Sequence, residues 1–102
     1  MDGAAIVSRD GLPVVVDLPA TFDRESFSAM VAAMVGAAET ALIEAGRGTP
    51  ERIIMENAGT RILATGVSDR FLLVVTGRGD LSMDRLSAAI ASLSKELQTL
   101  TA

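Results

Sequence analysis

Four residue types that carry much of protein chemistry are missing from this chain of 102 residues, which has no histidine, cysteine, tryptophan or tyrosine. Without cysteine there is no disulfide framework and no thiolate metal site, which fits a reducing compartment. Without histidine, acid–base catalysis near neutral pH is left to the carboxylates and to the single lysine, Lys95. The aspartates fall in turns and at helix starts, where Asp bonds the backbone. We therefore predict no catalytic, cofactor-binding or metal-binding residue, and a protein that is not an enzyme on its own.

Positive charge and aromatic side chains are also scarce. The net charge is −4, the nine Lys and Arg residues are scattered with no two adjacent, and the aromatic residues are three Phe. Proteins that bind nucleic acids usually carry a basic stripe or aromatic side chains on which bases stack. The sequence therefore predicts no nucleic-acid partner.

The apolar segments of the sequence are shorter than a membrane span requires. The longest apolar run, Ala29–Ala38, has ten residues, whereas a bilayer span needs about 20. The N-terminus has no basic region followed by an apolar run, so no signal peptide is readable. We expect a cytoplasmic protein with no membrane insertion.

A glycine-rich segment, Gly77-Arg78-Gly79-Asp80, lies between an expected strand and an expected helix, as a phosphate-binding loop would. It lacks the lysine of a Walker loop and the third glycine of a dinucleotide fingerprint. The segment is therefore interpreted as a link between two elements, and we expect no unaided binding of nucleotide.

Turn residues divide the chain into elements in the order β-β-α-β-β-β-α. The Asp10-Gly11 pair is a hairpin signal for a tight primed turn between the first two strands. Helices are expected after Asp23 and Ser82 as N-caps, and Phe22 and Phe27 are expected to form a hydrophobic staple at the start of the first helix. The expected strands are 3–8, 12–17, 52–56, 60–65 and 70–76, and the expected helices are 24–45 and 83–99.

Two of these strands have a predictable place in a sheet. Pro13 has no backbone N–H, which favours an edge position for the second strand. The run Phe71–Val75 shows no polar alternation, so the fifth strand is expected at the centre with a helix on each face. Strands joined by short turns are antiparallel neighbours.

The first helix is apolar on almost all sides, which is unusual for a surface helix. On a helical wheel we place one wide apolar face against the sheet: Phe27, Met30, Val31, Met34, Ala38, Ala41 and Leu42. The opposite face is made of small and apolar residues with Ser28, Glu39 and Glu44 among them, and it predicts packing against a partner: Ala29, Ala32, Ala33, Gly36, Thr40 and Ile43. Enrichment of alanine as a good helix former is the alternative explanation.

The third strand is predicted to offer a second part of this interface. It follows the helix directly, so one of its sides is expected to be unpaired. Arg52 and Glu56 flank Ile54 on one face. Their opposite charges would pair if two copies of the strand met antiparallel.

The order of these features resembles the Roadblock/LC7 family over residues 4–100. The resemblance rests on the Ala- and Met-rich helix, on Phe71-Leu72-Leu73-Val74-Val75, and on the opening segment Gly3-Ala4-Ala5-Ile6-Val7-Ser8-Arg9-Asp10-Gly11-Leu12-Pro13-Val14. It implies a single Roadblock/LC7-like domain over residues 1–102, of the α/β (α+β) class. The implied fold is a five-stranded antiparallel sheet in the order 2-1-5-4-3, flanked by a helix on each face. Members of the family usually begin with an additional helix before the first strand, which this sequence is expected to lack.

The resemblance also implies function. Family members form homo- or heterodimers in which the third strands pair across a two-fold axis and the long helices lie side by side. We therefore expect a homodimer that binds or regulates a small Ras-like GTPase across the paired helices, with Glu39 and Glu44 at the edge of that surface and Arg47 as the arginine nearest to it. The alternative is a structural adaptor or scaffold subunit, like the dynein-associated members, with no effect on nucleotide turnover. A third hypothesis, a small-molecule sensor, is disfavoured because no pocket-forming polar cluster is readable.

Overall fold

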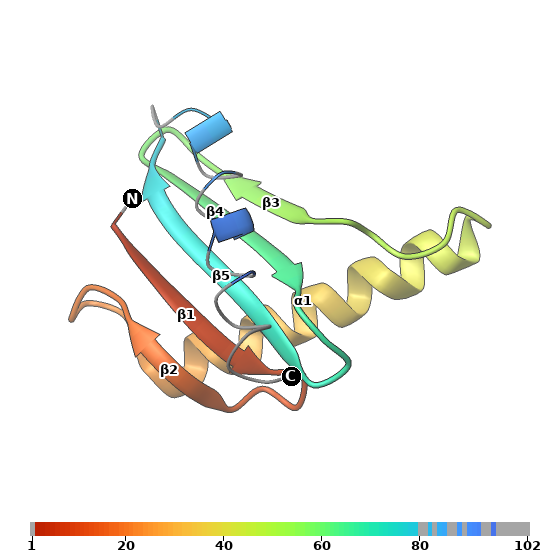
Figure 1. Cartoon of the computed structure of the whole chain (residues 1–102), viewed down its shortest axis with the longest axis horizontal. Helices are drawn as coiled ribbons and strands as arrows, with labels where there is room; N and C mark the ends of the chain where they lie inside the picture. Colours follow the sequence, from red (N-terminus) through yellow and green to blue (C-terminus); the bar gives the residue numbers. More distant parts are fainter. Residues whose placement is uncertain are drawn as a thin grey trace.

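The computed structural model describes residues 2–79 and, toward the C-terminus, the separate residues Ser82, Asp84, Arg85, Ala88, Ile90, Ala91, Ser92 and Lys95. Its elements follow the predicted order (Figure 1). They are β1 (Gly3–Ser8), β2 (Pro13–Asp17), α1 (Arg24–Glu44), β3 (Ile53–Glu56), β4 (Thr60–Gly66) and β5 (Phe71–Arg78). All predicted strands and the first helix are confirmed, with ends that differ by one or two residues.

The five strands form one antiparallel sheet in the order β2-β1-β5-β4-β3. The predicted strand order is therefore confirmed, with β5 at the centre and both β2 and β3 at edges. β5 is buried from Leu72 to Gly77, because it is paired on both sides and covered on both faces. Its unbroken apolar run is what this position requires.

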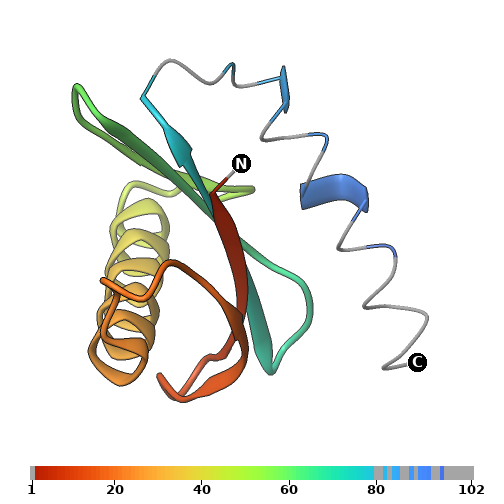
Figure 2. The same ribbon diagram turned by 90° about the vertical axis from the view of Figure 1, so that its left-hand side faces the viewer.

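The two faces of the sheet are covered by different segments of the chain (Figure 2). On the first face α1 packs over a core that includes Val7, Val31 and Leu72. On the second face Ile90 packs against Leu63 and Val75. Residues 84, 85, 88, 90–92 and 95 are helical, and the Ser82 hydroxyl accepts the backbone N–H of Arg85 at 3.2 Å, as its predicted capping role requires. The rest of the predicted 83–99 helix lies outside the described residues.

The ends of α1 follow from local chemistry. The Asp23 carboxylate accepts the backbone N–H of Ser26 at 3.1 Å, and the rings of Phe22 and Phe27 pack edge to face with centroids 5.0 Å apart. This confirms the predicted N-cap and hydrophobic staple. The helix ends before Gly46, whose φ of +71° is left-handed.

The rotation of α1 about its axis differs from the prediction. Its buried residues are Ser28, Val31 and Val35, whereas Met30, predicted to face the sheet, is 66% exposed. Ala41 is exposed as well. A helix that is apolar all round leaves its rotation undetermined by pattern, so packing shape against the sheet decides it.

Helix α1 is also long and apolar enough to cross a membrane, judged by length and composition alone, and it is the one such helix among the described residues. The core helix of a globular domain can have the same composition. Here its buried residues Val31 and Val35 belong to the core cluster that also contains Val7 and Leu72 of the sheet.

The loop between β1 and β2 is one residue longer than the predicted primed turn. Ser8 donates its N–H to the Leu12 carbonyl and Gly11 donates to the Ser8 carbonyl, both at 2.9 Å. The loop is therefore residues 9–11. Gly11 has φ +92°, and no non-glycine residue in the described part of the chain has positive φ. A type I′ turn needs positive φ at both central residues, and here only Gly11 has it. The Asp-Gly pair therefore predicted the hairpin correctly, but the predicted loop length was wrong.

Two hydroxyl groups are buried in the core, and the described residues give them no hydrogen bond. Ser28 is 0% exposed and Thr76 2%, and neither hydroxyl oxygen has a hydrogen-bond partner among the described residues. A buried polar group without a partner destabilises a fold by about 1–3 kcal/mol.

Replacing Ser28 by alanine is expected to stabilise the protein. The change removes the unpartnered hydroxyl and improves helix propensity, so the free energy of unfolding should rise by about 1–2 kcal/mol. Urea unfolding followed by circular dichroism measures it. Ser26→Ala on the exposed first turn is the matched control and should change stability by a few tenths of a kcal/mol. A loss of stability in Ser28→Ala would show that the hydroxyl has a partner.

Candidate interaction surface

The C-terminal half of α1 presents an exposed apolar surface. Gly36, Thr40 and Ile43 are exposed, Ile43 to 59%. No heavy atom of the described residues lies within 4 Å of the position where a Cβ on Gly36 would sit, leaving out the helix's own nearby backbone. In Figure 1 this end of the helix extends beyond the strands of the sheet. Another backbone could approach closely here.

The N-terminal half of the predicted helix face is already in contact with the chain itself. A Cβ on Gly11 would lie 3.2 Å from the Ala29 Cα and 3.8 Å from the Ala32 Cβ, so the β1–β2 loop rests on these two alanines. Ala32 is half-buried and packs against the core. Its predicted place on the outer face is wrong, while Ala33 is exposed.

The edge strand β3 forms the second part of the surface. Ile54 is 43% exposed and Met55 39%. Ile54 lies opposite Leu63 in β4, on the face that Ile90 covers, and Met55 lies opposite Ile62 on the α1 face. Met55 was not among the predicted interface residues, although strand alternation places it on the same face as Ile53.

Charged residues border the apolar part of β3. Glu56 lies opposite Arg61, and its carboxylate accepts a hydrogen bond from the Arg61 Nε at 2.9 Å. Arg52 is exposed at the start of the strand. Glu56 therefore has a partner within its own chain, which the sequence pattern did not reveal.

The two edges of the sheet differ in how they would receive another strand. The pairing of β2 with β1 shifts register between Ile6 and Val7, and Pro13 in β2 lacks a backbone donor. Such features protect natural edges from further pairing. β3 pairs with β4 in an unbroken register and contains no proline, so β3 is the edge better suited to accept a strand.

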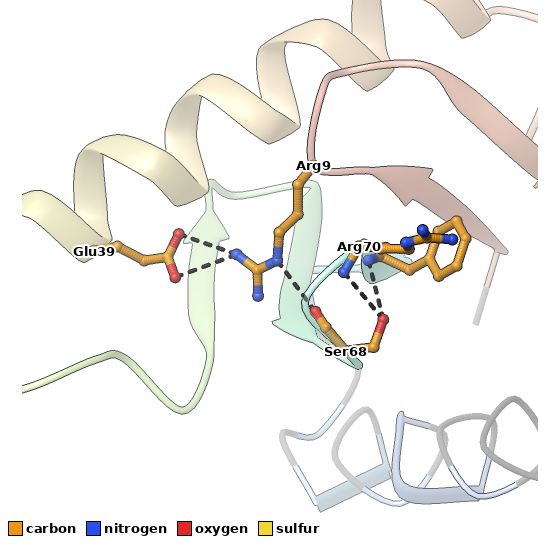
Figure 3. Close-up of polar contacts among 5 residues, drawn as sticks. Arg9, Glu39, Ser68 and Arg70 are labelled. Carbon is orange, nitrogen blue, oxygen red and sulfur yellow. Dashed lines mark hydrogen bonds and ion pairs between the residues drawn. The ribbon is translucent and has the colours of Figure 1, made fainter. Parts of the chain in front are cut away.

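An ion pair joins α1 to Arg9, which follows β1, and Arg9 also contacts the loop between β4 and β5 (Figure 3). The Arg9 Nη1 lies 3.1 and 3.2 Å from the two carboxylate oxygens of Glu39, and the Arg9 Nε donates to the Ser68 carbonyl at 3.2 Å. The Ser68 hydroxyl in turn accepts the backbone N–H of Arg70. Glu39 was predicted at the edge of the outer face, and this position is wrong because its carboxylate is turned toward Arg9. Residues 30 and 59 positions apart meet here, which local patterns cannot indicate.

A cavity of about 790 Å³ opens between this ion pair and β3. Its apolar lining residues are Val35, Pro50, Ile53, Ala64 and Val67, and its charged lining residues are Arg9, Glu39, Glu51, Arg52 and Asp69. The sequence predicted no polar cluster that forms a pocket. That prediction is wrong, because the fold assembles these residues from distant segments. Among the described residues no group of three acidic, histidine or cysteine side chains could hold a metal ion.

The sequence of the chain matches a protein-family model and several known proteins. A family model described as the Roadblock/LC7 domain matches residues 1–76. Two uncharacterized proteins of Methanocaldococcus jannaschii are each 35% identical over 74 residues, which cover 72% of this chain and 65% of the relative. The chain therefore spans less than two thirds of the length of these relatives.

Solved structures show the same fold at low sequence identity. Myxococcus xanthus MglB superposes with a TM-score of 0.89 at 21% identity, covering 97% of this chain and 81% of that one. A Roadblock/LC7 domain from Streptomyces avermitilis gives 0.88 at 18% identity, covering 97% and 83%. A profilin from Acanthamoeba castellanii is more distant, with a TM-score of 0.66 at 14% identity over 93% and 82% of the two chains. The fold class and the resemblance predicted from sequence are confirmed.

Proposed function

Because the chain belongs to the Roadblock/LC7 family, we propose that it is a dimeric protein-interaction module that binds or regulates a small Ras-like GTPase in the cytoplasm. The observation that carries this proposal is that α1 and β3, which follow one another in the chain, each leave apolar side chains exposed. The C-terminal half of α1 contributes Ile43, and the unprotected edge strand β3 contributes Ile54 and Met55. Exposed apolar surface of this kind marks interaction sites.

A second copy of the chain fits this surface better than it fits the β2 edge. Pairing of β3 with its copy would continue the sheet across a two-fold axis and supply its unused backbone groups with partners. The same axis would bring the two α1 helices together, with Gly36 allowing close approach of their backbones. The predicted residues Thr40 and Ile43 lie in this half of the helix.

The chemistry of the chain favours a non-enzymatic role. It has no histidine or cysteine, so the most common general base and the thiolate nucleophile are missing. A module of this kind acts by holding partners in place. Regulation of a GTPase would then consist in ordering the GTPase's own switch segments.

Binding to a Ras-like GTPase is expected without an arginine finger. Arg47 lies in the exposed loop after α1, nearest to the paired helices. Arg47→Ala should leave stimulated hydrolysis within about twofold, whereas loss of a finger costs about 10³-fold or more. Each Ras-like GTPase of the source organism is tested for binding and for turnover, with Arg24→Ala at the far end of α1 as the matched control. A large loss of hydrolysis in Arg47→Ala with binding intact would contradict the ordering mechanism.

The structural adaptor is the second candidate function, and the same experiment separates it. An adaptor would bind its partner with no change in nucleotide turnover. The sensor hypothesis gains one observation, the cavity beside Arg9 and Glu39, and ligand-dependent melting would support it.

A further inference from the structure

The edge strand is complementary in charge to its own reversed sequence. From Arg52 to Glu56 the order is basic, three apolar residues, acidic. We propose that β3 pairs with β3 of a second copy in one register, with Ile54 opposite Ile54 at the two-fold axis and Arg52 opposite Glu56. This inference rests on the proposed dimer and specifies how each copy selects the other.

The position of α1 limits the registers that are possible. If the helices of both copies cover the same face of the continuous sheet, residues that face each other must point to the same side. Side chains alternate between faces along a strand, so the partners must lie an even number of positions apart in sequence. A slip of one residue would put the two helices on opposite faces.

Among the registers centred on one of the three apolar residues of the strand, the one centred on Ile54 matches the side chains best. An axis at Ile53 would place Ile54 opposite Arg52 and Met55 opposite Glu51. An axis at Met55 would place Ile54 opposite Glu56. With Ile54 at the axis, Ile53 faces Met55 and each arginine faces a glutamate.

The carboxylate of Glu56 is held in place and is still accessible to a second arginine. The Arg61 Nε holds its carboxylate at 2.9 Å, yet the Glu56 side chain remains 55% exposed. Arg52 of the second copy would approach from the side away from β4. Glu56 would then lie between two arginines in a row that crosses β4, β3 and the second β3, and opposite charges in such rows are favourable.

Cysteine substitution tests the register directly, because the chain contains no cysteine of its own. Directly opposite residues have Cα atoms about 4.5–5.5 Å apart, within the range that a disulfide spans. Ile54→Cys should therefore form a disulfide-linked dimer under mild oxidation at least about tenfold faster than Ile53→Cys or Met55→Cys alone, whose equivalent Cα atoms would be more than about 7 Å apart. A mixture of Ile53→Cys with Met55→Cys should cross-link as readily as Ile54→Cys. Preferential self-cross-linking of Ile53→Cys or Met55→Cys would overturn the register.

Exchange of charges tests whether the ion pairs select the partner. Arg52→Glu and Glu56→Arg should each weaken their own homodimer, because like charges then face each other twice. Mixed together, the two variants should form the heterodimer at least about tenfold in excess over a statistical mixture, measured by native mass spectrometry. Glu51→Lys mixed with unmodified protein is the control and should give the statistical ratio.

The outcomes separate this inference from the proposed function. A statistical mixture of the two charge variants, with dimers still formed, would overturn the register and leave the dimer standing. A monomer mass for the unmodified protein by light scattering would overturn both.

Discussion

Replacing Gly11 by valine is expected to remove a large part of the stability of the fold. Gly11 has φ +92°, and a Cβ there would lie 3.2 Å from the Ala29 Cα. A β-branched residue at positive φ costs about 1–3 kcal/mol, and overpacking adds about 1–3 kcal/mol. The free energy of unfolding, measured with urea, should fall by about 3–5 kcal/mol, against about 5–15 kcal/mol for a whole domain.

A second left-handed glycine separates the two causes. Gly48 has φ +83°, and no described atom lies within 4 Å of its Cβ position. Gly48→Val therefore carries the backbone strain without the contact and should cost about 1–3 kcal/mol or less. An equal loss of stability in the two variants would mean that the β1–β2 loop does not rest on α1.

The elements predicted most accurately from sequence are those that local chemistry fixes. The run Phe71–Val75 predicted the central strand because a strand buried on both faces has no polar alternation. Asp23 and the two aromatic rings of the staple predicted the start of α1, since capping involves residues close in sequence. The strand order itself came from the family resemblance.

The features that sequence reasoning missed depend on packing between distant segments. The rotation of α1 could not be read from a helix with apolar residues on every side, so Ser28 and Glu39 were placed outward and Met30 inward. The contacts of Arg9 with Glu39 and Ser68 join segments that only the folded sheet brings together. The predicted interface is correspondingly narrower, because Ala29 and Ala32 already support the loop at Gly11.

Replacing Gly36 by arginine is expected to dissociate the dimer while making the isolated chain more stable. Glycine in a helix interior is about 0.5–1 kcal/mol less favourable than alanine, and arginine is close to alanine. In the single chain the arginine side chain would extend into open space, so it should not disturb the fold. In a closely packed pair of helices the same charge would be buried without a partner, at a cost of about 3–5 kcal/mol, or more than about 100-fold in Kd.

The two effects have opposite signs, which distinguishes loss of the interface from loss of the fold. Light scattering should give the monomer mass at concentrations where the unmodified protein is dimeric. The melting temperature of Gly36→Arg should no longer depend on concentration, because binding between copies contributes stability only through mass action. Ala37→Arg, exposed on the adjacent side of the same helix, is the matched control and should stay dimeric. If Gly36→Arg remains a dimer while Ala37→Arg becomes a monomer, the helices meet through the side that carries Ala37, and the assignment of Gly36, Thr40 and Ile43 to the contact is wrong.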